Sequence, residues 1–269
     1  MLTLILAVSA ALGGFSVAFW AAGFGLGWSI TVGVVSFIAV QVGLSWRFMK
    51  RIKADMQAVQ AIMAEGQKAI QAKVARWQFR PPGSVAEAQR IIMDDTRVFV
   101  RQAIAEADKL RKYRPWVMLI DRQIATAKVQ LNWMIKDFAQ VDAYMPKAIM
   151  LDPLSVSMKM ARMQMLGKPI EEITKVYEKC AKRLKYNENA LLAGCYTWIL
   201  MKRGDSDAAF KALTAALKSS DNETLKRNHE CLMNNRPAQF SNSGLGDQWY
   251  ALHLEEPKMR ARQQRSVYR

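Results

Sequence analysis

Charged residues are missing from the first 46 positions of the chain, and the first one is Arg47. All 39 lysine and arginine residues and all 23 aspartate and glutamate residues therefore lie after this segment, and the formal net charge is +16. One membrane-spanning helix needs about 20 predominantly apolar residues, so the uncharged segment is longer than a single span requires. This pattern indicates a membrane anchor followed by a polar and basic remainder.

Cysteine, glycine and proline are also scarce. The three cysteines, Cys180, Cys195 and Cys231, are too few and too widely spaced for a disulfide framework, and none belongs to a CxxC pair. With 14 glycines and 8 prolines the chain is neither collagen-like nor a flexible linker. Its hydrophobic content of 51% is too high for a disordered protein. These absences leave a folded protein in a reducing compartment.

Sequence motifs for catalysis are missing as well. The chain contains no GxxxxGK[ST], GxGxxG, HExxH or GxSxG sequence. His229 and His253 are in separate segments, and Glu230 and Cys231 would point away from His229 on a helix because adjacent side chains diverge. We therefore expect a protein that is not an enzyme and that needs no metal ion or cofactor.

The uncharged segment 1–46 is long enough for two membrane-spanning helices, which we expect at about 2–22 and 29–46. The glycine-rich sequence 23–28 suits the turn between them. Trp20, Trp28 and Trp46 stand where amphipathic rings mark the membrane interfaces. A cleaved signal peptide is the alternative, but the segment lacks a basic start and its apolar run continues past 30 residues. A two-helix transmembrane hairpin is the prediction.

A basic cluster follows the second predicted span. Arg47, Lys50, Arg51 and Lys53 place four positive charges within seven residues. The positive-inside rule puts this end of the span in the cytoplasm, and with two spans the N-terminus is then cytoplasmic too. We expect an integral protein of a bacterial-type inner membrane, with both termini and the soluble part in the cytoplasm.

Segment 47–83 is predicted to be a basic amphipathic juxtamembrane helix. It has eight basic and two acidic residues, and its apolar residues recur at spacings of four, three and seven. Three environments fit such a helix: the anionic inner leaflet, a coiled coil between copies of the chain, and packing on the domain that follows. The charge favours the lipid surface, while Gly66 interrupts the heptads of a coiled coil.

The soluble part shows no sustained alternation of apolar and polar residues, so we expect it to be all-α. Ser84 and Glu87 form a capping box at the start of a helix that ends near Lys112. Pro115 suits the first turn of the next helix. Residues 84–256 are predicted to form one helical-repeat domain.

The C-terminal part is predicted to consist of a short helix that caps this domain and a tail that does not pack on it. Asp247 begins a short capping helix in which Trp249, Tyr250 and Leu254 are too apolar for a free tail. Segment 257–269 is a basic tail without acidic residues, which suits a membrane surface or an acidic partner.

Two segments of the soluble part resemble the second helix of a tetratricopeptide repeat. Segments 137–153 and 204–217 follow that family's pattern of an acidic turn and a helix with small alanines. Two of these alanines are 68 residues apart, twice the family period of about 34. The repeat-defining positions are Ala148, Pro153, Ala181, Gly204, Ala209 and Ala216. The resemblance covers roughly 115–220, and a generic helical bundle is the alternative.

The resemblance implies an α-solenoid whose concave face binds a peptide or helix of a partner protein. Within it, Lys179, Lys182, Arg183 and Lys185 recur at helical spacing. This cluster suits an acidic partner or nearby lipid, and a solvated helix face is the alternative. Nucleic acid is not expected as a partner, because no nucleic-acid-binding motif accompanies the charge.

Taken together, these features predict a membrane-anchored, tetratricopeptide-like scaffold or adaptor that binds protein partners at the cytoplasmic face of the membrane. The alternative is a structural accessory subunit that a larger membrane complex holds through the transmembrane hairpin. The lipid bilayer is a partner in both, and a homo-oligomer stays open.

Overall fold

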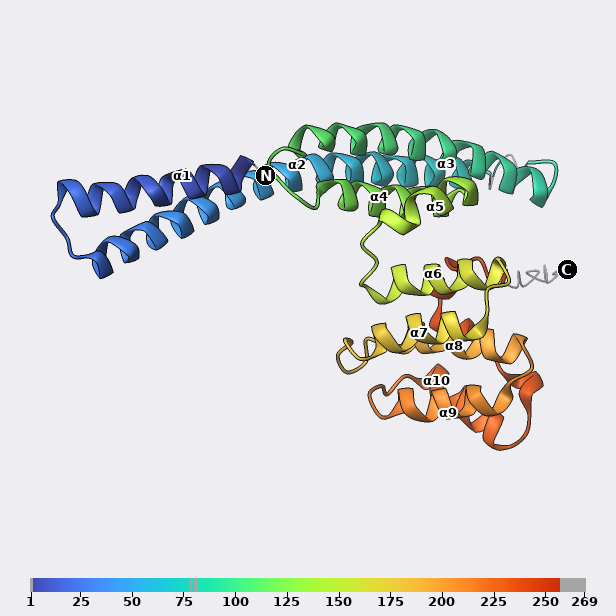
Figure 1. Cartoon of the computed structure of the whole chain (residues 1–269). Coiled ribbons are helices and arrows are strands. Elements are labelled where there is room, and N and C mark those ends of the chain that lie inside the picture. Colours follow the sequence, from blue (N-terminus) through green and yellow to red (C-terminus); the bar gives the residue numbers. More distant parts are fainter. Residues whose placement is uncertain (1, 78, 80–81, 257–269) are drawn as a thin grey trace, which may run out of the picture. The chain divides into compact units, whose positions relative to one another are not determined.

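The computed structural model describes residues 2–77, 79 and 82–256, and this part of the chain is all-helical without strands, as predicted (Figure 1). The chain divides into two compact units, Met1–Ile149 and Met150–Arg269. The boundary lies inside the segment 84–256, for which the sequence predicts a single repeat domain. The predicted basic tail, 257–269, lies outside the described residues.

The first unit begins with two apolar helices that pack against each other. α1 spans Leu2–Ser16, continues as the π-helical turn η1, Val17–Ala21, and is followed by α2, Leu26–Arg76. Gly33 permits the close approach, because a Cβ at this position would lie 3.1 Å from the carbonyl oxygen of Ala11. Both helices are long and apolar enough to cross a membrane.

The turn between the two apolar helices is shorter than the predicted 23–28. Gly23 adopts a left-handed backbone conformation with φ of +64°, which glycine tolerates because it has no Cβ. Gly27 and Trp28 already belong to α2.

α2 does not end where the second predicted span ends. It runs without a break for 51 residues, so the span and the basic segment after it are one helix. Phe48 and Ile52 are buried in one cluster with Leu110, Tyr113, Ile120 and Ile124, and Val59 is buried in another with Val100, Ala103, Ala107 and Leu131. Three environments fit the apolar stripe, and the structure shows the third of them: the stripe packs on the helices that follow.

Three α-helices and two 3-10 turns complete the first unit: α3, Val85–Asp108; η2, Lys109–Tyr113; α4, Ile120–Met134; α5, Phe138–Tyr144; and η3, Met145–Lys147. The predicted helix start at Ser84 is confirmed, although the Glu87 side chain bonds the residue before Ser84 and not Ser84 itself. The backbone N–H of Glu87 donates to Ser84 Oγ at 3.1 Å, and the Glu87 carboxylate accepts from the N–H of Gly83 at 3.1 Å.

Two helix boundaries in this unit differ from the prediction, and both differences involve proline. Pro115 does not begin a helix, because turns occupy the positions after η2 and α4 begins only at Ile120. Segment 137–153 is not one helix: α5 ends before Pro146, which lacks a backbone donor, and Ala148 has an extended conformation.

The second unit is a series of short helices: α6, Pro153–Met165; α7, Ile170–Ala181; α8, Ala190–Lys202; α9, Ser206–Leu217; α10, Glu223–Met233; and α11, Asp247–Tyr250. Two 3-10 turns, η4 at Pro237–Gln239 and η5 at Ser243–Leu245, precede α11. Helices α6 to α10 each pack on the next in the chain, and α6 also packs on α8 (Figure 1).

The other repeat-defining residues lie at helix ends and interfaces. Pro153 begins α6 and Ala181 ends α7. Gly204, with φ of +80°, makes the turn between α8 and α9, where Ala209 and Ala216 are buried. Small side chains at buried positions let neighbouring helices approach closely.

The C-terminal helix packs on the domain, as predicted, although α11 is only four residues long. Trp249 and Leu252 are completely buried. The indole N–H groups of Trp198 on α8 and of Trp249 both donate to the carboxylate of Glu255, at 2.7 and 2.8 Å. These bonds fasten the end of the described chain to α8.

The contact between α2 and α3 yields a first prediction. A Cβ on Gly66 would lie 2.6 Å from the Phe99 ring, whereas one on Gly43, in the same helix, meets nothing within 4 Å. Gly66→Ala should therefore lower the free energy of unfolding by about 1–3 kcal/mol through overpacking. Gly43→Ala should cause no loss. Denaturant unfolding of the detergent-solubilised protein measures both, and equal stability of the two variants would contradict the packing described.

The capping of α9 yields a second prediction. The Asp205 carboxylate accepts the backbone N–H of Ala208 at 2.9 Å, while Asp207 in the same first turn makes no capping bond. Asp205→Ala should cost about 0.5–2 kcal/mol, because one N–H at the helix start loses its acceptor. Asp207→Ala is the matched control and should cost less. Hydrogen exchange of the α9 amides reports the difference.

Candidate functional site

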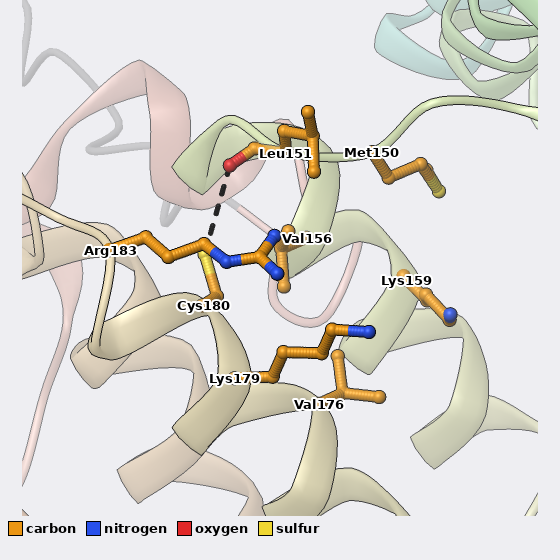
Figure 2. Close-up of a pocket in the computed structure, with 8 residues that line it drawn as sticks. All are labelled: Met150, Leu151, Val156, Lys159, Val176, Lys179, Cys180 and Arg183. Carbon is orange, nitrogen blue, oxygen red and sulfur yellow. Dashed lines mark hydrogen bonds between the residues drawn. The ribbon is translucent and has the colours of Figure 1, made fainter.

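A basic pocket in the second unit lies between α6 and the end of α7 (Figure 2). Its volume is about 160 Å³. The lining residues are Met150, Leu151, Val156, Lys159, Val176, Lys179, Cys180 and Arg183. Three of them are basic and none is acidic, so the pocket combines an apolar floor with positive charge.

The three basic residues reach the pocket from two helices. Lys179 and Arg183 are four residues apart, so they lie on the same side of α7 and the turn after it. Figure 2 shows both side chains extended toward α6, where Lys159 lies. Positive side chains are favoured at the C-terminal end of α7, because the helix dipole is negative there.

These charges are not neutralised within the described part of the chain. No ion pair joins Lys159, Lys179 or Arg183 to a carboxylate there. Arg183 and Lys179 are exposed, while Lys159 is half-buried. Such an arrangement attracts anions, and a carboxylate or phosphate could pair with more than one of the cations.

The predicted basic cluster is therefore only partly brought together. Lys179 and Arg183 line the pocket, whereas Lys182 and Lys185 are exposed outside it. Sequence reasoning missed Lys159, which lies 20 residues before Lys179. The spacing within one helix could not reveal it, because its position depends on the packing of α6 on α7.

Cys180 forms part of the pocket wall. Its Sγ donates weakly to the carbonyl oxygen of Leu151 at 3.9 Å, and the side chain is buried. Burial raises the pKa of the Cys180 thiol, and the charge of Arg183 opposes this shift. A thiol that stays protonated is a poor nucleophile. Cys195 is fully buried and burial also raises its pKa, so neither thiol has the character of a nucleophile.

A second candidate surface lies on α2 in the first unit. Gly43, Trp46, Arg47, Lys50, Arg51 and Ala54 line a shallow hollow of about 660 Å³. This face is opposite the buried Phe48 and Ile52, and the Trp46 side chain is 72% exposed. Lys53 is exposed outside the hollow. The surface thus places one aromatic ring beside three cations on the same side of α2.

The other predicted interface residues lie at the turn between α1 and α2. Trp20 is 82% exposed and Trp28 is 72% exposed. Both side chains flank the turn, and Trp28 lies 18 residues before Trp46 on α2, which is about the length of one span. Tryptophans at the two ends of apolar helices match the interfacial belts of membrane proteins.

The described residues contain no group of three or more histidine, cysteine, aspartate or glutamate side chains that could hold a metal ion. His229 stacks on Phe210 with a ring-centroid distance of 4.6 Å, and its Nε2 lies 3.0 Å from the hydroxyl of Thr214. These contacts give it a place in the packing of α9 on α10.

Comparison with known proteins finds no family model that matches the chain, and no similar curated protein or solved structure. The basic pocket and the aromatic, basic face of α2 are therefore interpreted from their own chemistry.

An ion pair between α2 and η2 yields a prediction on the pH dependence of stability. The Oδ2 atom of Asp55 on α2 lies 2.7 Å from the Nζ atom of Lys112 in η2. Hydrogen bonding to Lys112 lowers the pKa of Asp55, and Tyr113 adds to the shift against the opposing effect of burial. The pair therefore stabilises the fold above the ordinary aspartate pKa of about 4, and this contribution is lost as the pH falls through the lower folded value.

Asp55→Asn should remove this part of the acid sensitivity. Between pH 3 and pH 7, the melting temperature of this variant should be lower than that of the original protein at neutral pH, and the two values should converge in acid. Asp94→Asn, which breaks only a local pair with Arg97 on α3, is the control. A constant difference over the whole pH range would contradict the assignment.

Proposed function

We propose that the chain is a membrane-anchored, non-enzymatic scaffold that binds an acidic segment of a protein partner at the cytoplasmic face of a bacterial-type inner membrane. The observation that carries this proposal is the basic pocket between α6 and α7. Lys159, Lys179 and Arg183 converge on it without a carboxylate among the lining residues. An acidic side chain or a chain-terminal carboxylate has the complementary charge.

The proposal treats the helices from α6 onward as tetratricopeptide-like repeats. Support comes from the pairing of α6 with α7 and of α8 with α9, from the glycine turn at Gly204, and from the buried Ala209 and Ala216. Stacked helix pairs leave one face of the array for a ligand. The floor of Val156 and Val176 would accept an apolar residue beside the acidic one.

The proposal also treats α1 and the first part of α2 as a transmembrane hairpin. Support comes from the length and apolar character of both helices and from the exposed tryptophans. Arg47, Lys50, Arg51 and Lys53 follow the second span and favour the cytoplasm for the remainder of the chain.

Charge reversal in the pocket tests the binding function. The full chain, carrying Lys159→Glu, Lys179→Glu and Arg183→Glu, should lose at least tenfold in partner recovery after crosslinking in cells and purification in mild detergent. Each lost cation becomes a repelling charge at the position where the acidic segment binds.

The control carries the same charge change elsewhere in the unit, at Lys211, Lys218 and Arg227, which are exposed and line no part of the pocket. It should recover partners normally. Equal losses in both variants would mean that net charge alone matters, and equal recovery would reject the pocket as the binding site.

The alternative function is that of an accessory subunit held through the hairpin. Ala39 and Gly43 favour it, since both are exposed on α2 and lie four residues apart, a spacing that lets another membrane helix approach closely. In that case, both charge variants should recover the same membrane proteins. Ala39→Leu with Gly43→Leu should then lose them, whereas the scaffold proposal expects no loss.

A further inference from the structure

We infer that the loop between η2 and α4, residues 114–119, is a third point of contact with the bilayer, at which Met118 and Leu119 enter the lipid interface. The inference rests on the proposed transmembrane hairpin and goes beyond it, because this loop belongs to the part of the chain predicted to be soluble. Its occupant is a lipid surface that contains anionic headgroups.

The length of the first helix fixes the depth of its ends. α1 and η1 together cover Leu2–Ala21, which is 20 residues. At about 1.5 Å per residue this equals the hydrocarbon thickness of about 30 Å. With the turn at one boundary of the bilayer, Leu2 therefore lies at the opposite boundary.

Hydrogen bonds hold the loop at the depth of Leu2. The backbone N–H of Leu2 donates to the carbonyl oxygen of Pro115 at 2.9 Å. The hydroxyl of Thr3 donates to the carbonyl oxygen of Trp116 at 3.2 Å. The loop thus lies beside the end of α1 that meets the headgroup region.

The second helix places the loop at the same depth independently. The rings of Phe48 and Trp116 stack with centroids 4.7 Å apart. Leu44, Trp116 and Val117 all pack against the cluster that contains Phe48. Leu44 is 18 residues after Leu26, so about 27 Å of helix separates it from the turn. Both helices therefore bring the loop to one membrane boundary, near Trp46.

The exposed side chains of the loop suit an interface. Met118 is 68% exposed and Leu119 is 42% exposed, although both are apolar. Arg111 and Arg114 precede them; their side chains are 63% and 74% exposed, and they pair with Asp108 at 3.1 Å and with Asp121 at 2.9 Å. Apolar residues beside cations are the composition of segments that lie in the headgroup region of anionic membranes.

Site-directed spin labelling of the full chain tests the inference. Single cysteines replace Met118, Leu119, Leu12 and Met134, and the protein is reconstituted in nanodiscs of phosphatidylcholine and phosphatidylglycerol. The three native cysteines are buried and free, and a sample without added cysteines corrects for any label they take up. Power saturation compares the accessibility of each label to oxygen and to a water-soluble nickel chelate.

Leu12 is 64% exposed near the middle of the candidate span Leu2–Ala21 and reports the span itself. Met134, 41% exposed at the far end of α4, is the matched control outside the membrane. We expect labels at 118 and 119 to favour oxygen over the chelate at least fivefold more than the label at 134, as the label at 12 does.

A lipid-exposed label at 12 together with labels at 118 and 119 that match the one at 134 would overturn the loop contact and leave the hairpin intact. Aqueous accessibility at position 12 as well would overturn the hairpin and the loop contact together. Labels at 118 and 119 that are shielded from both reagents would indicate a protein contact and would also overturn the inference.

Discussion

The continuity of α2 is the constraint on which the first unit depends. One helix carries exposed apolar side chains along its first half and a buried stripe along its second half. Phe48 and Ile52 begin the buried stripe directly after Trp46. The helices that follow bury apolar residues against this stripe in two clusters as well as against one another, so the long apolar helix also forms part of the core of the first unit.

The same arrangement explains why charge and burial alternate around α2. Arg47, Lys50 and Arg51 occupy the side that faces away from the cluster, because a charged side chain in that cluster would lose its hydration without a partner. The basic residues thus face away from the core, while the apolar residues pack into it. An amphipathic helix of this kind need not lie flat on the lipid to explain its pattern.

Sequence reasoning succeeded where the governing interactions are local. The helix start at Ser84 and Glu87 was predicted, since it depends on residues within one turn. Helix was also predicted on both sides of position 46, and the structure joins the two segments in the single helix α2. Backbone hydrogen bonds continue through the change from apolar to charged residues.

The candidate site divides in the same way. Lys179 and Arg183 share a helix face and were found from their spacing, whereas Lys159 comes from a different helix and needs the packing of α6 on α7. Ala148 matched a repeat pattern, but Pro146 interrupts the helix on which the pattern depends. A pattern of residue types does not show which residues of different helices come together, because that depends on tertiary packing. It also does not show where a single proline ends a helix.

An unbroken α2 also fixes the angle between the side chains of its first half and those of its second half. Each residue of an α-helix advances the chain by about 100° around the axis and about 1.5 Å along it. A single residue inserted between Trp46 and Phe48 would leave both flanking sequences helical, yet it would turn the buried stripe by more than a quarter of a circle relative to the apolar half of the helix. The number of residues in this stretch, and not only their character, sets the direction in which the apolar half of α2 presents the rest of the first unit.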